Sequence, residues 1–204
     1  MSSGWVIVRA RMSGGVSRLI QISICLLFAC ALHQRAAAQA ILSPPFGLQW
    51  GDTPDKVLEW AEQKKLDVTI EIKGAQPELR IIRVTSPRGS LPEHLAYSLE
   101  TRYHWGKLFE VTVHYGAPGM KPDRVRSDFE TLKKALTAKH GAFTPNNKQE
   151  NEQDGIIRQS VSYHVEPVRG LLLLLGMTEV EDTRRKKHSV RFSLLYRNQN
   201  IIPK

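Results

Sequence analysis

Cysteine is scarce in this sequence of 204 residues, and its two copies, Cys25 and Cys30, both lie within the first 40 positions. If that segment is removed, the remaining chain has no thiol and can form no disulfide. This excludes the small secreted scaffolds that depend on cross-links, and it excludes a zinc site built from thiolates. The rest of the chain must therefore be stabilised by a buried core, and it is long enough to form one ordinary core or two small ones.

Apolar runs of membrane-spanning length are also missing. The segment from Leu19 to Leu32 is apolar apart from a few residues such as Gln21, but it is shorter than the roughly 20 residues that a membrane helix needs. It is followed by the polar residues 33–35. The run therefore fits the hydrophobic region of a signal peptide better than an anchor, and we expect no membrane span after cleavage.

The flanks of this run predict a signal peptide over residues 1–40. Arginines precede it, and Ala38-Gln39-Ala40 carries the small residues that signal peptidase recognises. The mature chain is then expected to begin near Ile41 and to be periplasmic or secreted.

Two points at the N-terminus stay open. Translation could begin at Met1 or at Met12, and either start gives the same mature chain. Leu27-Phe28-Ala29-Cys30 loosely matches the cleavage box of bacterial lipoproteins, although Phe28 is bulky where a small residue is usual. Cleavage there would leave Cys30 as a lipidated N-terminus instead of a soluble exported protein.

The charge is mildly positive. The formal net charge of the whole chain is +9, and residues 1–40 contain four arginines and no acid, so the remainder carries +5. Such a bias favours contact with anionic surfaces but does not indicate nucleic acid, which an exported protein seldom meets. The basic run Arg184, Arg185, Lys186 and Lys187 is the candidate contact surface, for an anionic membrane or an acidic protein. The alternative is an ordinary solvated hairpin tip.

Periodicity predicts an α+β protein with an antiparallel sheet, or sheets, and helices packed on one face. Helices are expected at 54–65 and 122–140, and strands at 66–72, 79–85, 95–104, 108–115, 156–165, 170–180 and 188–197. The polar segment 144–155 is expected to be a solvated loop.

The order of elements suggests two halves, 41–118 and 119–204, each a helix followed by strands. The alternative is that both belong to one continuous domain. Gly51-x-x-Pro54-Asp55 recurs as Gly119-x-x-Pro122-Asp123 at the start of each helix. Either the halves are a tandem repeat, or Pro-Asp has been chosen twice because it begins helices well.

A hairpin joins the third and fourth expected strands through Trp105-Gly106-Lys107. Pairing His104 with Leu108 sets Tyr103 against Phe109, Leu99 against Val113 and Tyr97 against Tyr115 on one face. It sets Arg102 against Glu110 on the other. A shift by one residue would bury charge on both faces, so this register is favoured.

Two further features bear on packing. Phe129 lies on the apolar stripe of the second helix and is expected to be its most deeply buried residue, with Asp128 and Glu130 pointing to water. The five leucines from Leu171 to Leu175 place apolar side chains on both faces of a strand, so both faces need cover, or one of them is kept for a partner.

The start of the mature chain carries a resemblance to known families. Phe46-Gly47-Leu48-Gln49-Trp50-Gly51-Asp52-Thr53-Pro54-x-x-Val57 resembles the opening of the SmpA/OmlA outer-membrane assembly lipoproteins and of the β-lactamase-inhibitor-like proteins. The stretches 106–111 and 132–141 are similar to the body of the same loose group. The resemblance implies helices packed on an antiparallel sheet, and it implies no particular binding residue.

No pattern of catalytic, cofactor or metal-binding residues is found. The chain has no Gly-x-Ser-x-Gly motif, no phosphate-binding glycine loop and no His-Glu-x-x-His spacing. A weak metal site can be drawn from Glu110, His114 and His104, but a solvated sheet face explains them better. We therefore expect no enzyme and no cofactor.

The expected function is that of an exported, non-catalytic binding or assembly protein of the bacterial cell envelope, whose partner is unknown. The alternatives are an envelope enzyme, such as a hydrolase, with a scattered site, or a lipid-anchored outer-membrane assembly factor.

Overall fold

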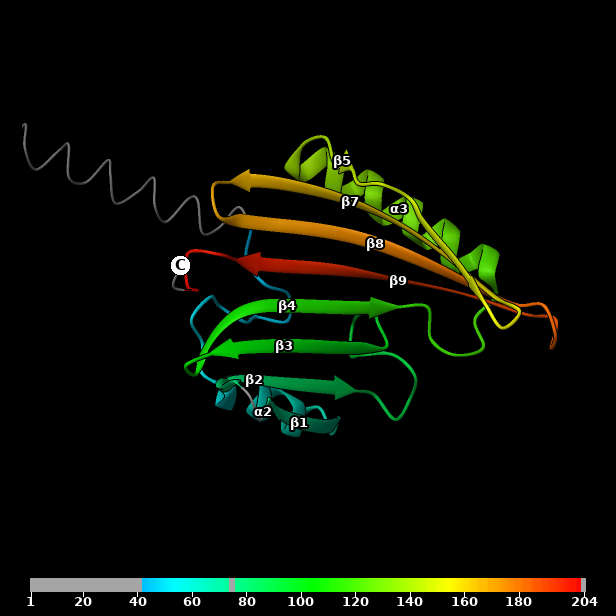
Figure 1. Ribbon diagram of the computed structural model, residues 1–204. Helices are drawn as coiled ribbons and strands as arrows, with labels where there is room; N and C mark the ends of the chain where they lie inside the picture. Colours follow the sequence, from blue (N-terminus) through cyan, green and yellow to red (C-terminus); the bar gives the residue numbers. More distant parts are fainter. Residues whose placement is uncertain (1–41, 74–75, 203–204) are drawn as a thin grey trace, which may run out of the picture. The chain divides into compact units, whose positions relative to one another are not determined.

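The computed structural model describes residues 42–73 and 76–202 of the chain. The predicted signal peptide, its cleavage site and Cys30 lie outside these residues. The described part is an α+β fold with two helices and an antiparallel sheet, as the periodicity predicts (Figure 1), and the sheet has nine strands instead of the seven expected. The sheet order is β1-β2-β3-β4-β9-β8-β7-β5, and β6 also pairs with β7. The strands are β1 (Asp67–Lys73), β2 (Gln76–Thr85), β3 (Ser98–His104), β4 (Lys107–Tyr115), β5 (Thr144–Pro145), β6 (Gln149–Gln153), β7 (Ile156–Val168), β8 (Leu171–Asp182) and β9 (Lys187–Asn198).

Both helices begin where proline is tolerated. α2 (Pro54–Gln63) and α3 (Pro122–His140) each carry proline in the first turn, followed by an aspartate that favours the positive end of the helix. α3 ends at His140 and is capped by Gly141, whose φ of 94° suits glycine. Both helices therefore lie where the sequence predicts them, with α2 ending two residues early.

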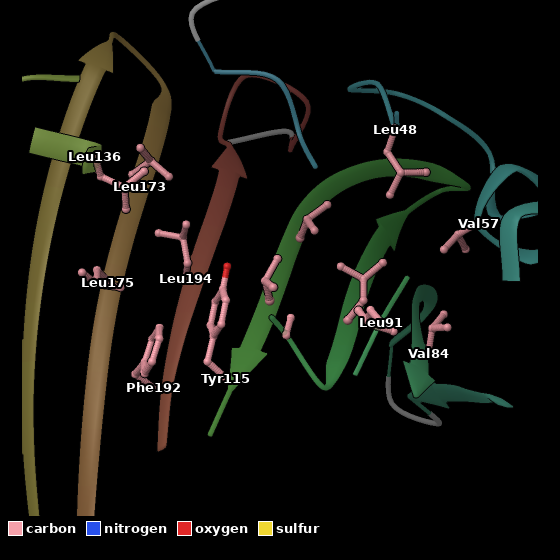
Figure 2. Packing of buried hydrophobic residues seen from close by; sticks show 14 of the residues in the cluster. Leu48, Val57, Val84, Leu91, Tyr115, Leu136, Leu173, Leu175, Phe192 and Leu194 are labelled. Atoms are coloured by element: carbon pink, nitrogen blue, oxygen red, sulfur yellow. The ribbon is translucent and has the colours of Figure 1, made fainter. Parts of the chain in front are cut away.

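One buried apolar cluster runs along the sheet. It includes Val57 of α2, Val125 and Phe129 of α3, and inward residues of β2, β3, β4, β8 and β9 (Figure 2). Phe129 is almost fully buried, as expected, and Glu130 is exposed. Asp128 is half-buried and accepts hydrogen bonds from Arg124, which differs from the expectation that it points to water. That both helices lie on one face of the sheet stays a prediction.

A chain of aromatic contacts links the two expected halves of the protein. The rings of Tyr115 on β4 and Phe192 on β9 stack with centroids 4.4 Å apart, and Figure 2 shows them side by side. Phe129 of α3 meets Phe192 edge-on at 5.6 Å, while His94 lies 5.6 Å from Tyr115 on the other side. Since β4 also pairs with β9, residues before and after position 118 share one sheet and one cluster.

The β3–β4 hairpin confirms most of the expected register and corrects its tip. Leu99 lies opposite Val113, and Arg102 lies opposite Glu110. The connection is a two-residue turn, Trp105-Gly106, with φ of 49° and 72°, instead of the three residues expected. Two positive φ values match the twist of a tight hairpin.

A bulge then compensates for the shorter turn. His104 pairs with Lys107, and Tyr103 pairs with Leu108 instead of Phe109. Phe109 is the extra residue, and the register returns to the expected one at Glu110. Tyr97 lies just before β3, outside the paired residues, although its backbone N–H donates to His114 O at 2.9 Å.

The segment 144–155 differs most from expectation. Instead of a solvated loop, it contains β5 and β6, both antiparallel to β7. All five residues of β6 are polar and exposed, so the sequence of this strand has no alternation of apolar and polar residues. Backbone pairing to the long strand β7 stabilises it, and this does not depend on side-chain hydrophobicity.

The leucine run is covered unequally. Leu171, Leu173 and Leu175 are buried in the cluster, whereas Leu172 and Leu174 on the other face are only half-buried. The side chains of β8 therefore distinguish a core face from an open face of the sheet.

Candidate functional site

The basic residues predicted as a contact surface lie at the turn between β8 and β9. Arg184, Arg185 and Lys186 are exposed in the turn, and Lys187 begins β9 opposite Asp182. Asp182 also accepts a hydrogen bond from the backbone N–H of Arg185, at 2.9 Å, and lies 3.8 Å from its guanidinium. The tip therefore has one carboxylate beside two of its four cations.

This tip is held by a second hairpin turn. The backbone N–H and the hydroxyl of Thr183 both donate to the carbonyl oxygen of Gly155, at 2.9 Å each. Gly155 belongs to the turn between β6 and β7, so the two turns lie side by side. The four basic residues are neighbours in sequence, and the structure places the β6–β7 turn beside them.

The residues of the weak metal site are separated. His104 lies at the Trp105 end of the β3–β4 hairpin, and His114 lies at the opposite end of β4, across from Ser98. The carboxylate of Glu110 forms ion pairs with Arg102 and Arg197. Over residues 42–73 and 76–202, no group of three or more His, Asp or Glu residues is placed to hold a metal ion.

A row of alternating charges crosses the open face of the sheet. We call it the charge ladder; its members are Glu71 on β1, Arg83 on β2, Glu100 and Arg102 on β3, Glu110 on β4 and Arg197 on β9. Successive members form ion pairs, with closest N–O distances of 3.8, 2.8, 2.9, 3.3 and 2.5 Å. Three carboxylates and three guanidinium groups thus neutralise one another.

The two inner carboxylates of the ladder are well covered. The side chain of Glu110 is 2% exposed and that of Glu100 is 9% exposed, whereas the arginines keep a third to a half of their side-chain surface in water. Burial alone would raise the pKa of Glu100, but hydrogen bonds from Arg83 and Arg102 outweigh it and hold the pKa below its ordinary range. The ladder therefore differs from the lone exposed pair that the hairpin register suggested.

A hollow of about 590 Å³ lies on the same face, over β6, β7, β8 and β9. We call it the arginine hollow; it is lined by Gln149, Arg158, Ser160, Thr178, Val180, Ser189 and Arg191. The volume lies within the range of small-molecule sites, but the lining is polar and the hollow is open to solvent. Its described lining residues include two arginines and no acid.

Among the described residues, no carboxylate forms an ion pair with the arginines of the hollow. Arg191 lies opposite Thr178, and Arg158 lies opposite Asn151 and Val180. Neither guanidinium forms an ion pair with an acid in the part of the chain that the structure describes. Strand spacing and rise place their Cα atoms about 12 Å apart across β8, close enough for both long side chains to reach one ligand.

Sequence reasoning did not identify these residues, although their pattern was present. On β7, Arg158, Ser160 and Ser162 alternate with apolar or bulky residues, and on β9, Ser189, Arg191 and Ser193 alternate with Val190, Phe192 and Leu194. Each strand alone looks like an ordinary solvated face. Only the pairing of β7, β8 and β9 shows that the two arginines share one surface and that no acid lies between them.

Comparisons with protein-family models, with curated proteins and with solved structures find no match for this chain. The resemblance of residues 46–57 to the SmpA/OmlA and β-lactamase-inhibitor-like groups therefore stays a prediction. In the described residues, no helix is both long and apolar enough to cross a membrane.

Proposed function

We propose that this chain is an exported, non-catalytic binding protein of the bacterial cell envelope, and that the arginine hollow is its binding surface. The observation that carries the proposal is a pair of guanidinium groups, Arg158 and Arg191, which lie beside several hydroxyl side chains and form no ion pair with a carboxylate of the described residues. The signal-peptide pattern of residues 1–40 supports the location in the periplasm or outside the cell.

The chemistry of the hollow selects an anionic ligand. A guanidinium group binds carboxylate, phosphate or sulfate through two parallel N–H donors. Ser160, Thr178 and Ser189 add hydroxyl groups that both donate and accept hydrogen bonds. An open, polar hollow also suits a segment of an extended molecule better than an apolar cofactor, which would need enclosing apolar walls.

Retention on an immobilised polyanion such as dextran sulfate tests the surface. Arg158→Gln/Arg191→Gln and Arg184→Gln/Arg185→Gln each remove two positive charges, one pair from the hollow and one from the tip. If the hollow binds, the first variant should elute at clearly lower salt than the second, because salt dependence follows the cations that contact the ligand. Equal elution, or a larger loss from the tip variant, would overturn the hollow and favour the tip surface.

Export has its own test. Mass spectrometry of the protein from an export-competent bacterial host should give a chain beginning at Ile41. An acylated chain beginning at Cys30 would show the lipid-anchored alternative, and an uncleaved chain would remove the proposed location.

A further inference from the structure

The outer strand β1 has an uncovered edge and uncovered apolar residues. Within the described residues, β1 pairs only with β2, so its other edge presents unpaired backbone groups. Val68, Ile70 and Ile72 point to one face and are 39, 54 and 59% exposed, although their alternation predicts a half-buried strand. An apolar strand edge of this kind favours pairing with another strand.

We propose that a second copy of this chain covers the edge, with the two β1 strands antiparallel about a two-fold axis through Ile70. Ile70 then lies opposite Ile70 of the other copy, and Val68 lies opposite Ile72. On the other face, Thr69 lies opposite Glu71, so that no like charges meet across the axis. A two-fold axis makes each contact between different residues twice and the Ile70 contact once, as a closed dimer requires.

The neighbouring registers are unfavourable. A shift by one residue sets the apolar Val68 and Ile70 against the polar Glu71 and Thr69, and it places apolar side chains on both faces. Centring the axis on Thr69 sets Asp67 against Glu71, and centring it on Glu71 sets that carboxylate against its own copy. Of these registers, only the axis at Ile70 matches apolar with apolar residues and puts no like charges opposite each other.

The proposed dimer does not depend on the arginine hollow. β1 lies at one end of the sheet order, and the hollow lies over β6 to β9 at the other. The copies would continue one another's sheets and leave both hollows open. Loss of ligand binding and loss of the dimer can therefore be measured separately.

Sedimentation velocity of the exported protein over a range of concentrations provides the test. The wild type should show a monomer–dimer equilibrium. Ile70→Lys should weaken it at least about tenfold, because two lysines then face each other and two apolar side chains are lost. Leu95→Lys is the matched control, since Leu95 is 71% exposed in the loop before β3 and lies outside the pairing. It should leave the equilibrium unchanged.

A charge pair at Val68 and Ile72 tests the register. Val68→Lys should weaken the dimer, because it places a lysine opposite the apolar Ile72 twice, and Val68→Lys/Ile72→Glu should restore it, because opposite charges then lie opposite each other. Circular dichroism spectra establish that each variant is folded. A wild type that stays monomeric up to about millimolar concentration, a dimer that persists unchanged with Ile70→Lys, or a charge pair that restores nothing would each overturn the proposal.

Discussion

The charge ladder and the arginine hollow lie on the same face of the same sheet. Both contain an arginine of β9, but the two arginines have different neighbours. In the ladder, Arg197 lies opposite Glu110, and in the hollow, Arg191 on the same strand lies opposite Thr178. The distance between the two arginines along β9 is only six residues. The residue opposite on the neighbouring strand therefore decides whether an arginine forms an ion pair within the sheet or is available to a ligand.

The difference is also one of solvation. The carboxylates of the ladder are buried between guanidinium groups, so the ladder is internally neutral and offers a ligand no free charge. In the hollow, hydroxyl side chains take the place of carboxylates, and the two positive charges keep their affinity for anions. This comparison predicts that substitutions in the ladder affect stability and that substitutions in the hollow affect binding.

The largest effect on stability should come from the core side of the strands that form the hollow, where α3 packs against β7 and β9. Phe129 of α3 contacts Phe192 on β9 and Tyr163 on β7, at 5.6 and 6.2 Å between ring centroids. Phe129→Ala should lower the free energy of unfolding by about 3 to 5 kcal/mol through lost burial and a residual cavity. Chemical denaturation measures the loss. The exposed neighbour Glu130→Ala should change it by less than about 0.5 kcal/mol, and a reversal of this order would mean that α3 packs through its other side.

The next largest effect should come from the ladder. Glu110→Gln removes the charge that separates Arg102 and Arg197 and leaves two guanidinium groups facing one neutral amide. Breaking a fully buried pair costs about 3 to 5 kcal/mol, and because both arginines are more than a third exposed we expect about 2 kcal/mol.

The hollow supplies the matched control for this variant. Arg158→Gln, which removes one charge from an unpaired residue, should change the free energy of unfolding by less than about 0.5 kcal/mol. Equal losses in the two variants would show that the hollow is as structural as the ladder, and the comparison between them would fail.

The pH dependence of stability should also separate the regions. The pKa of Glu100 is lower in the folded state than its ordinary value of 4.5, so the unfolded chain binds the proton first as the pH falls. The stability that this carboxylate contributes is therefore complete above pH 4.5 and is lost as the pH drops through the folded-state pKa. Denaturation midpoints of wild type and Glu100→Gln should converge below pH 4.5. A constant gap down to pH 3 would show that Glu100 does not titrate in this way.

How far the sequence predicts these features depends on where the information lies. Both helices and the Arg102–Glu110 pair follow from local patterns, namely Pro-Asp at helix starts and alternation along one hairpin. The two-residue turn at Trp105 was missed because tryptophan seldom takes a positive φ, and the bulge at Phe109 hid the difference by restoring the register.

The candidate sites were missed for a different reason. Arg83, Glu100 and Arg197 come from three strands, and no local pattern states that β9 lies beside β4. The same holds for Arg158 and Arg191, whose shared surface depends on β8 between them. By contrast, the basic run 184–187 is visible in sequence because its members are consecutive, and this visibility says nothing of whether it binds.

The variant with the smallest expected change in stability, Thr178→Glu, is also the sharpest test of the comparison, because it gives the hollow a carboxylate of the kind found in the charge ladder. Thr178→Glu places a carboxylate opposite Arg191, as Glu110 stands opposite Arg197, and diagonal to Arg158. An opposite-charge pair across two strands contributes about 0.2 to 1 kcal/mol, so stability should stay constant or rise slightly. Retention on dextran sulfate should fall below that of the wild type, but less than for Arg158→Gln/Arg191→Gln, because one carboxylate cancels one of the two positive charges. Thr178→Gln, of nearly the same size but uncharged, should keep the retention of the wild type. If Thr178→Glu binds as the wild type does, the hollow is not the binding surface, because the loss of half of its net charge would have made no difference.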